Sequence, residues 1–587
     1  MAFLINGFIV VPKEMFAVID LLKLKLLRSS LVLLLLVIAT LSGGCGADAS
    51  ADMQGIFTKN GIMLMNAVKP GDIPQEIVVR VNGESKEIQW QIMGGKNLIL
   101  AEFWEPWQNY EIEINGRKWN GTAPLTPTAA VLATGELGKL DETPSLKEWS
   151  PVVYEDVAVS PDGRFIGIAS FDHKIYLYDN TGKKLWDYGI PDGVGVAIAF
   201  ARDGLSLFVG ESSPEANCYA FDTLSGEKLW QYSFSGDIGS DSTPKWNNRP
   251  KITSIAVMGN QVVASAEYTQ RVTERLAGKA VVKYVTNCLI RAFDSRTGSS
   301  NWRYPQAETM DTGVSRLTFS ADGSKLAFAN HSWSKGQRYL DGSIRILDGA
   351  TGGVLGIHQL EEPKDGQCNY IGIFDGIHIS PNGRYLAVVT ADNRGMLFDI
   401  SHITIENSEQ GASTEFPLLW LRQISNVQRI GGVPVYAYGN TAHTTDDGQV
   451  LFMTGATFLA DKTATSGAPP FVHPDSTTLF FYRSNGELIW KWQSDGGIGK
   501  LRFSGDGRYL VLPIYHNYIT RKKDKAGLYC FDLTAAQGKN LLWFYPLEGI
   551  AVTTGIAENG TTVAGVEVPV RQSDDTLLGT HRLHILQ

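Results

Sequence analysis

The sequence predicts an all-β protein, and three observations support that prediction. Short apolar alternations of period two recur along the chain, each bounded by a turn such as Ser160-Pro161-Asp162-Gly163. Helical periodicity is nearly absent. Glycine, tryptophan and tyrosine are abundant, with 61, 14 and 21 copies among 587 residues, as expected of a chain rich in tight turns and half-buried strands. The repeated unit is therefore a small antiparallel sheet.

The stretch from Val157 to Trp186 shows one complete unit. Two apolar alternations flank the Asp162-Gly163 turn, a third follows, and the turn Asp179-Asn180-Thr181-Gly182 leads to a strand that ends on Trp186. One four-stranded sheet of this length cannot bury its own two faces. Because the unit repeats, the natural solution is a ring of such sheets, which is a β-propeller.

Counting the first turn of the unit gives the expected number of blades. The turn recurs at Asp162-Gly163, Asp203-Gly204, Gly259-Asn260, Asp322-Gly323, Asn382-Gly383, Asp447-Gly448, Asp506-Gly507 and Asn559-Gly560. We therefore expect an eight-bladed propeller over residues 129–587, and seven blades if the Gly259 unit is an insertion. The last unit has room for only three strands. The segment 146–149, which ends on Trp149, is the expected fourth strand and would close the ring.

Residues 1–45 have the pattern of an export signal. Lys23, Lys25 and Arg28 precede an apolar run of 11 residues, and Ser42-Gly43-Gly44 leads to Cys45. The run is too short for a comfortable membrane span. Small residues before a cysteine resemble the lipobox of bacterial lipoproteins, which implies acylation of Cys45 and a position at the outer membrane or cell surface. An ordinary signal peptide with an incidental cysteine is the alternative.

A smaller domain is expected between the signal and the ring. Residues 46–61 look like a tether, and residues 62–122 contain short alternating strands joined by Asn-Gly and Gly-Gly turns. This pattern favours a small immunoglobulin-like β-sandwich. The stretch Thr122-Ala-Pro-Leu-Thr-Pro-Thr128 then reads as an extended linker to the propeller.

The second turn of the unit has a signature of its own. Two copies fit A-x-D-x-x-x-G-x-x-x-W, from Ala220 to Trp230 and from Ala292 to Trp302, and shorter versions end on Trp186 and Trp490. This pattern resembles the tryptophan-docking motif of pyrroloquinoline quinone (PQQ)-type propellers, whereas the first turn is similar to that of WD-repeat propellers. The resemblance implies that Trp186, Trp230, Trp302 and Trp490 wedge between adjacent blades. The resemblance indicates the fold and gives almost no information about activity.

Catalytic chemistry is not expected. PQQ-like propellers include quinoprotein dehydrogenases and a non-enzymatic lipoprotein that helps outer-membrane barrel assembly; the enzymes carry adjacent cysteines over the cofactor, and this chain has no such pair. G-x-S-x-G, H-E-x-x-H, phosphate-loop and C-x-x-C motifs are also absent. We therefore assign no catalytic residue and expect no PQQ. A PQQ-dependent dehydrogenase is the alternative function.

The candidate binding residues lie in long loops on one face of the expected ring. Turns on the other face are short, and function usually resides in loops on a rigid scaffold. The residues chosen from these loops are His331, Trp333, Tyr515 and His516. Four carboxylates, each eight residues before an apolar position of a first strand, are expected to line the channel mouth or to cap turns there, and would bind a structural cation in the first case: Asp192, Asp311, Asp495 and Glu548.

The net charge of the chain limits the classes of partner that it is expected to bind. A net charge of −9 argues against nucleic acid as the main partner. We expect an exported, membrane-anchored lipoprotein that acts without catalysis, as a protein-interaction scaffold or ligand-binding module at the bacterial envelope. The identity of the protein or small ligand is left open by the sequence.

Overall fold

The fold is taken from a computed structural model of the chain. It describes residues 3–5, 8–10, 53–58, 61–65, 67, 74, 76–87, 89–93, 97–101, 109–122, 131–137, 154–241, 249–276, 279–331, 342–361, 373, 375–403, 416–430, 433–459, 472–515, 526–535, 540–551, 553–571 and 576–587. Cys45, Trp333, His516, Cys368 and the segment 146–149 lie outside the described residues.

The chain divides into two compact units, Met1–Leu125 with Thr465–Gly467, and Thr126–Ala464 with Ala468–Gln587. The first unit contains two four-stranded antiparallel sheets whose apolar side chains form one core, including Ile62, Leu98, Tyr110 and Ile112. That shared core makes the pair a β-sandwich; its immunoglobulin-like character stays a prediction. The strands of this unit are β1 (Phe3–Ile5) with β2 (Phe8–Val10), then β3 (Gln54–Thr58), β4 (Gly61–Met65), β8 (Asn97–Ala101) and β7 (Gln89–Met93), then β10 (Arg117–Thr122), β9 (Asn109–Ile114), β5 (Ile77–Val81) and β6 (Glu84–Lys86).

The second unit consists of antiparallel groups in which strands adjacent in sequence pair with each other. The first groups are β12 (Tyr154–Val159), β13 (Phe165–Ser170), β14 (Lys174–Asp179) and β15 (Lys184–Gly189); β16 (Val194–Phe200), β17 (Ser206–Ser212), β18 (Asn217–Asp222) and β19 (Lys228–Ser233); β20 (Lys251–Met258), β21 (Gln261–Leu276), β22 (Lys279–Asp294) and β23 (Ser300–Tyr304); and β24 (Gly313–Val314) with β25 (Thr318–Phe319), β26 (Lys325–His331), β27 (Ser343–Asp348) and β28 (Val354–Gln359). A single short helix, α3 (Ser235–Ile238), is described after β19.

The remaining groups continue the same pattern. They are β29 (Ile377–Ile379), β30 (Tyr385–Val389), β31 (Arg394–Asp399) and β32 (Leu418–Gln423); β33 (Gln428–Ile430), β34 (Val433–Thr444), β35 (Val450–Leu459), β36 (Thr478–Tyr482) and β37 (Leu488–Gln493); β38 (Gly497–Ile498) with β39 (Arg502–Phe503), β40 (Tyr509–Tyr515), β41 (Gly527–Asp532) and β42 (Leu541–Pro546); and β43 (Thr554–Ile556), β44 (Val563–Glu567), β47 (Arg582–Leu586) and β11 (Val131–Glu136), with the hairpin β45 (Val570–Arg571) and β46 (Leu577–Leu578) beside them. The unit at Gly259 forms the group β20 to β23.

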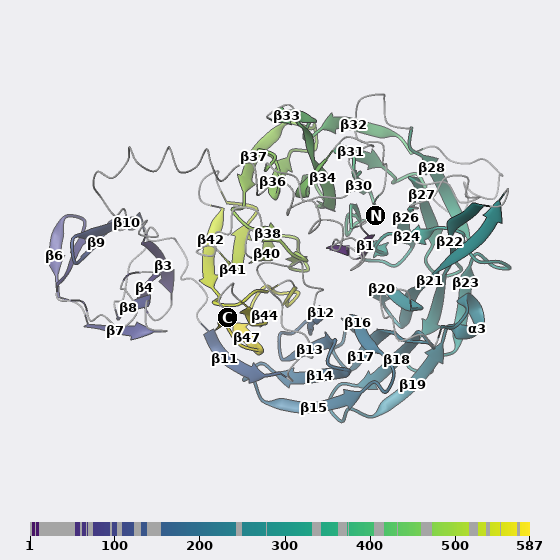
Figure 1. Cartoon of the computed structure of the whole chain (residues 1–587), viewed down its shortest axis with the longest axis horizontal. Helices are drawn as coiled ribbons and strands as arrows, with labels where there is room; N and C mark the ends of the chain where they lie inside the picture. Colours follow the sequence, from purple (N-terminus) through teal and green to yellow (C-terminus); the bar gives the residue numbers. More distant parts are fainter. Residues whose placement is uncertain are drawn as a thin grey trace, which may run out of the picture. The chain divides into compact units, whose positions relative to one another are not determined.

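The groups of the second unit form a closed ring (Figure 1). The first strands β12, β16, β20, β25, β29 and β34 contact one another in that order. His443 of β34 then stacks on Phe503 of β39, β39 contacts β43, and β43 contacts β12. The first strands therefore line the centre, and the predicted all-β propeller is confirmed in its overall architecture.

The strand that closes the ring is not the one expected from the sequence. β11 pairs antiparallel with β47, from Val131 opposite Leu586 to Glu136 opposite Arg582. The expectation for residues 146–149 rested on a tryptophan in the fourth-strand position and was wrong. Pairing along β47 depends on backbone hydrogen bonding, which β11 provides with one register shift between Val131 and Ala133 and without a docking tryptophan. The N- and C-terminal ends of the second unit are thus paired in one sheet, which removes a free edge.

The indoles of the second-turn motif join each blade to the next one. Nε1 of Trp186 donates to the carbonyl oxygen of Thr223 at 2.9 Å, and Nε1 of Trp230 donates to that of Ser295 at 2.9 Å. Trp302 makes the same bond to Gly349 at 3.2 Å. Each acceptor lies in the second turn of the following group, so one side chain fixes the position of two sheets.

A glycine in the receiving turn makes room for each indole. Gly226, Gly298 and Gly352 have φ values of +70°, +69° and +71° and lie directly against Trp186, Trp230 and Trp302, respectively. A side chain at any of these positions would overlap the ring it faces. The glycine of the motif therefore supplies both a left-handed turn residue and a flat docking surface.

Two tryptophans depart from the expected set. Trp420 of β32 was not predicted, yet its Nε1 donates to the carbonyl oxygen of Ser484 at 2.9 Å and its ring faces Gly486. A long insertion after Asp399 hides the motif spacing in the sequence. Trp490 is buried and lies nearly parallel to Phe531, but its Nε1 has no hydrogen-bond partner.

The cysteines that the structure describes are buried and unpaired. Cys218, Cys288 and Cys530 lie in β18, β22 and β41, the third strands of their groups, and are free thiols. Burial raises the pKa of the Cys218 thiol to about 12, which suppresses its reactivity. Within the described residues no helix has the length and hydrophobicity that a membrane-spanning segment requires.

The docking geometry predicts a difference between two glycine substitutions. Gly298→Ala and Gly259→Ala both place a side chain at positive φ, which costs about 1 kcal/mol. At Gly259 a Cβ meets nothing within 4 Å, whereas at Gly298 it would lie 2.7 Å from Cγ of Trp230. We expect Gly298→Ala to lower the free energy of unfolding by about 1–3 kcal/mol more than Gly259→Ala, measured by urea denaturation. Equal decreases in the free energy of unfolding for the two variants would show that the Trp230 indole makes no tight contact with the turn at Gly298.

Candidate functional site

The structure describes two of the four residues predicted for the binding face. Tyr515 ends β40 with 8% of its surface exposed, and its ring lies against Gly497. His331 ends β26 beside Glu267, and burial lowers the pKa of its imidazole. Trp333 and His516 fall outside the described residues. Tyr515 is therefore buried at the end of its strand, and His331 is half-buried at the end of its own.

No three of the four predicted channel carboxylates, all of which the structure describes, form a group that could hold a metal ion. Asp192 and Glu548 are exposed, while Asp311 and Asp495 are partly buried and have other interactions. Among the described residues, no three carboxylate, imidazole or thiol groups come close enough together to hold a metal ion. All four precede the first strands of their groups, and their expected place at the channel mouth stays a prediction.

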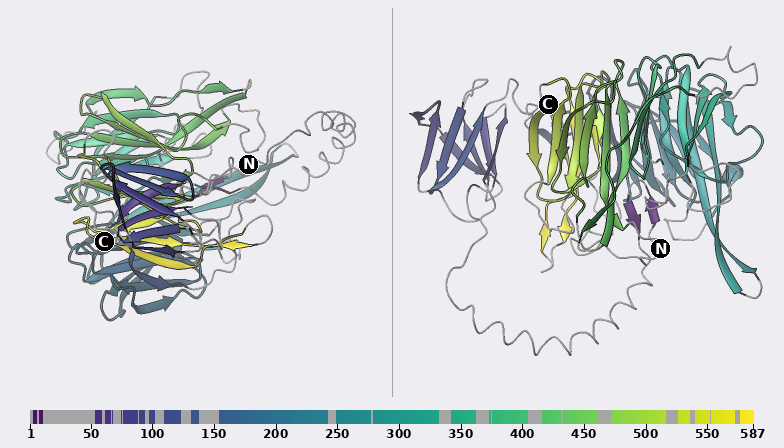
Figure 2. Two further views of the ribbon diagram at one scale, coloured as in Figure 1. Left: turned by 90° about the vertical axis from the view of Figure 1, so that its left-hand side faces the viewer. Right: turned by 90° about the horizontal axis from the view of Figure 1, so that it is seen from above.

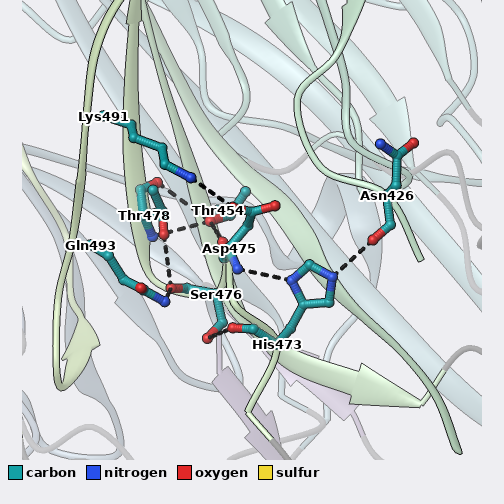
Figure 3. Close-up of polar contacts among 8 residues, drawn as sticks. All are labelled: Asn426, Thr454, His473, Asp475, Ser476, Thr478, Lys491 and Gln493. Carbon is teal, nitrogen blue, oxygen red and sulfur yellow. Dashed lines mark hydrogen bonds and ion pairs between the residues drawn. The ribbon is translucent and has the colours of Figure 1, made fainter. Parts of the chain in front are cut away.

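His473, another residue of the long loops, serves a local structural role (Figure 3). Its ring is fully buried; Nδ1 accepts a hydrogen bond from the Asp475 amide at 3.0 Å, and Nε2 lies 2.8 Å from the carbonyl oxygen of Asn426. Ser476 donates its hydroxyl to the His473 carbonyl at 2.9 Å. Both ring nitrogens are thus committed to backbone groups, and the ring holds the turn before β36 in place.

The structure places a different set of polar side chains in the channel. Arg502 of β39 donates from Nη2 to Oδ1 of Asp156 of β12, across 346 residues of sequence. β43 lies between these two strands in the ring, so the pair bypasses an intervening blade. Such a bond requires both side chains to point toward the centre of the ring.

Two histidines and a phenylalanine form an aromatic wall in the same region. His443 of β34 stacks on Phe503 of β39, with ring centroids 3.5 Å apart and an interplanar angle of 6°. Its centroid is 4.0 Å from that of His378 of β29, whose Nδ1 accepts a hydrogen bond from the Thr444 amide at 3.2 Å. These rings join three successive first strands.

The two imidazoles are held neutral. Burial, and then the nearby Arg316 guanidinium, lower the pKa of His378 to about 3. Burial lowers the pKa of His443 well below its ordinary value of 6.5, and His378 and Arg316 lower it further. At neutral pH the wall is therefore uncharged, and the fixed charges of the channel belong to its arginine and aspartate residues.

Arg316 lies in this channel between β24 and β25. It is exposed to solvent, and desolvation by the surrounding protein lowers the pKa of its guanidinium. The charges of Arg502, Asp375 and Asp156 also act on it. These groups come from four separate strand groups of the ring, which again places them around its centre.

Sequence reasoning missed this cluster, although a signal for it exists. Asp156 and Arg316 each stand six residues before the aspartate of a first turn. His378, His443 and Arg502 each stand four residues before the corresponding turn residue. Offsets of four and six select one face of a strand, and in a propeller that face of the first strand lines the channel. Charged residues or histidines at these offsets were the pattern to search for.

The comparisons with known proteins agree with this architecture. Residues 171–449 match the family model described as "Outer membrane protein assembly factor BamB". Apart from Gly486, which faces Trp420, that segment contains every tryptophan and glycine of the indole–glycine contacts described above. The matched segment lies within the β-propeller of the second unit. No curated protein sequence matches the chain.

Solved structures similar to the chain include propellers of both kinds. The C-terminal WD40 domain of Sif2 is 9% identical with a TM-score of 0.44, and covers 78% of this chain and 98% of its own. BamB from Moraxella catarrhalis is 11% identical with a TM-score of 0.43, and covers 78% and 99%. The Cps50 (Swd1) propeller domain from Myceliophteria thermophila is 11% identical with a TM-score of 0.39, at the same coverage.

The histidine wall makes the stability of the propeller sensitive to acid. Unfolded histidine titrates near pH 6.5, whereas folded His378 resists protonation down to about pH 3. As the pH falls below 6.5, the unfolded state binds protons first, and each such histidine lowers the free energy of unfolding by up to about 1.4 kcal/mol per pH unit. We expect His378→Asn to reduce this loss between pH 6.5 and pH 4.5, measured by urea denaturation. An unchanged slope would mean that His378 is not the group responsible.

Proposed function

We propose that the protein is an exported, lipid-anchored scaffold of the bacterial envelope that binds a protein partner through one projecting arm and performs no catalysis. The family model that matches residues 171–449 is named for an outer membrane protein assembly factor, which supports a role in protein interaction at the envelope. The observation that carries the proposal is the hairpin β21–β22.

The hairpin extends far beyond the sheet to which it belongs (Figure 2). β21 and β22 pair in continuous register from Gln261 opposite Asp294 to Leu276 opposite Lys279. β20 pairs with β21 only as far as Glu267, and β23 pairs with β22 only as far as Ile290. The arm, residues 268–286, therefore continues as a two-stranded ribbon.

The arm offers two features that suit a protein partner. Among the described strands, none pairs with its outer edges, and an open strand edge accepts an added strand through backbone hydrogen bonds. The arm is basic, although the whole chain has a net charge of −9. Its sequence contains one acidic residue, Glu274, and four basic residues: Arg271, Arg275, Lys279 and Lys283. The partner segment is therefore expected to be extended and acidic.

The base of the arm is fixed to the ring, so removing the outer part should leave the propeller intact. The hydroxyls of Thr269 and Thr286 lie 3.0 Å apart across the two strands, and Asn287 donates to the carbonyl oxygen of Ile238 at 3.0 Å. These contacts lie at the ring end of the arm, outside residues 270–285.

Shortening the arm tests the interaction. A variant in which residues 270–285 are replaced by Asn-Gly, a two-residue hairpin turn, should lose its protein partner while its melting temperature stays within a few degrees of the parent. Crosslinking in intact cells, followed by quantitative mass spectrometry of parent and variant side by side, measures the loss. A matched control shortens the β45–β46 hairpin, and should keep the partner. Retention by the arm variant, or loss only after changes to the first unit, would contradict the proposal.

The lipid anchor is tested separately. Cys45→Ser removes the thiol that would be acylated, so the variant should move from the detergent phase to the aqueous phase in a phase-separation experiment. Ser42→Leu, which brings the sequence before Cys45 closer to the lipobox pattern, should remain in the detergent phase. A Cys45→Ser variant that still partitions with detergent would show that another segment attaches the protein to the membrane.

A further inference from the structure

The outer part of the arm has one strand edge whose charged residues are of both signs. At the start of the arm the segment 239–241 lies beside β21, where the Tyr268 hydroxyl donates to Oδ2 of Asp241 at 3.0 Å. Beyond it, residues 271–276 continue β21, and among the described strands they pair with β22 alone. The opposite edge of this stretch is therefore open in the described part of the chain, over the length of an ordinary strand.

The order of residue types along this edge can fix the register of an added strand. The edge reads Arg-Val-Thr-Glu-Arg-Leu from 271 to 276. Residues two apart lie on the same face of a strand, so positions 271, 273 and 275 share one face and position 274 belongs to the other. Thr273 and Arg275 are exposed to solvent. A strand that adds to this edge therefore meets a different charge on each face.

The other edge of the arm does not carry this information. The free part of β22 contains Lys279 and Lys283 and no acidic residue. Charges of one sign attract an acidic strand in several registers alike, because repulsion between like charges is what excludes a wrong register. On β21, Glu274 beside Arg275 supplies both attraction and repulsion. The β21 edge is therefore the one that can select its partner.

We propose that the β21 edge of the arm binds an antiparallel strand with acidic residues opposite Arg271 and Arg275 and a basic residue opposite Glu274. The inference rests on the proposed function of the arm and adds the edge, the strand direction and the residue pattern of the partner. Along the partner strand, from the residue opposite Leu276 to the one opposite Arg271, the pattern is apolar, acidic, basic, neutral, apolar and acidic.

The backbone and the side chains contribute differently to such binding. Hydrogen bonds to the open edge supply an attraction that does not depend on sequence, and antiparallel pairing is the slightly more stable arrangement per residue. Directly opposed side chains of opposite charge stabilise a strand pair, whereas like charges destabilise it. Because the arm projects beyond its sheet (Figure 2), each ion pair is exposed to solvent and contributes little by itself. Selectivity then comes from the sum of the pairs.

Repulsion strengthens this selectivity. A shift of the partner strand by one residue in one direction places its acidic residue opposite Glu274. A shift in the other direction places its basic residue opposite Arg275. Either shift also moves every side chain of the partner to the wrong face of the ribbon. The neighbouring registers are therefore disfavoured twice, by charge and by orientation.

Two labelled peptides of identical composition test the pattern on the purified full chain. The matched peptide, Ser-Val-Glu-Lys-Thr-Val-Glu-Thr, has the proposed order, and the swapped peptide, Ser-Val-Lys-Glu-Thr-Val-Glu-Thr, exchanges the neighbouring glutamate and lysine. Fluorescence anisotropy should show that the matched peptide binds roughly tenfold more tightly, because two attractive pairs become repulsive ones in the swapped peptide. The preference should shrink as the salt concentration rises.

Two results of these titrations would overturn the proposal. Equal affinities of the two peptides would show that the edge does not read the order of charges. Absence of binding by both peptides would show that the charged residues of β21 protect the edge from pairing instead of selecting a partner strand. The variant in which residues 270–285 are replaced by Asn-Gly should bind neither peptide, which locates the binding on the arm.

Exchanging the two charges on the arm should reverse the preference. Glu274→Lys combined with Arg275→Glu keeps the net charge and should bind the swapped peptide more tightly than the matched one. The control, Arg483→Glu combined with Glu487→Lys, exchanges an exposed ion pair before β37 and should keep the preference of the parent. Circular dichroism and the melting temperature show whether each variant is folded. If the folded arm variant still prefers the matched peptide, the strand binds elsewhere and the proposal is wrong.

Failure of this inference is distinguishable from failure of the proposed function. If shortening the arm abolishes partner binding in cells while the two peptides bind alike, the arm binds its partner without this pattern. If the peptides are discriminated but the shortened variant keeps its partner in cells, the edge is selective and the proposed function is wrong. Each result contradicts one of the two statements and leaves the other standing.

Discussion

The fold depends on one contact repeated around the ring, an indole docked on the glycine of the next turn. A four-stranded sheet must cover both of its faces, and each docked tryptophan covers part of two sheets while its N–H reaches a neighbouring carbonyl. Glycine at positive φ is required because any Cβ there would occupy the space of the ring. The Trp490 indole is packed in the same way although its N–H has no acceptor, which indicates that the contact depends more on packing of the ring than on the hydrogen bond.

Closure of the ring creates the channel and its chemistry. When β11 pairs with β47, the first strands are forced to face a common centre, and residues hundreds of positions apart become neighbours. Arg502 and Asp156 meet there as an ion pair, and the stacked rings of His378, His443 and Phe503 join three successive first strands.

Two features of the propeller depart from the repeated unit. The arm β21–β22 extends beyond the strands that pair with its base. Asp156, His378, His443 and Arg502 place charged or imidazole side chains on first strands of the ring. In such a repeated scaffold, a binding site can form at a blade whose strands differ from the repeat in length or in residue type, while the other blades keep that blade in a fixed position.

The sequence by itself determined the strands, the turns and the docking tryptophans, because these depend on periods and spacings within about 35 residues. It identified Trp186, Trp230 and Trp302 as contacts between sheets, since their motif includes the glycine of the same turn type that receives them. Only the tertiary structure decided which strand closes the ring, that Trp420 docks despite a long insertion, and that Tyr515 is buried. It alone brought Asp156 to Arg502, because ring closure is a long-range event and no local pattern records which side chains will meet at the centre.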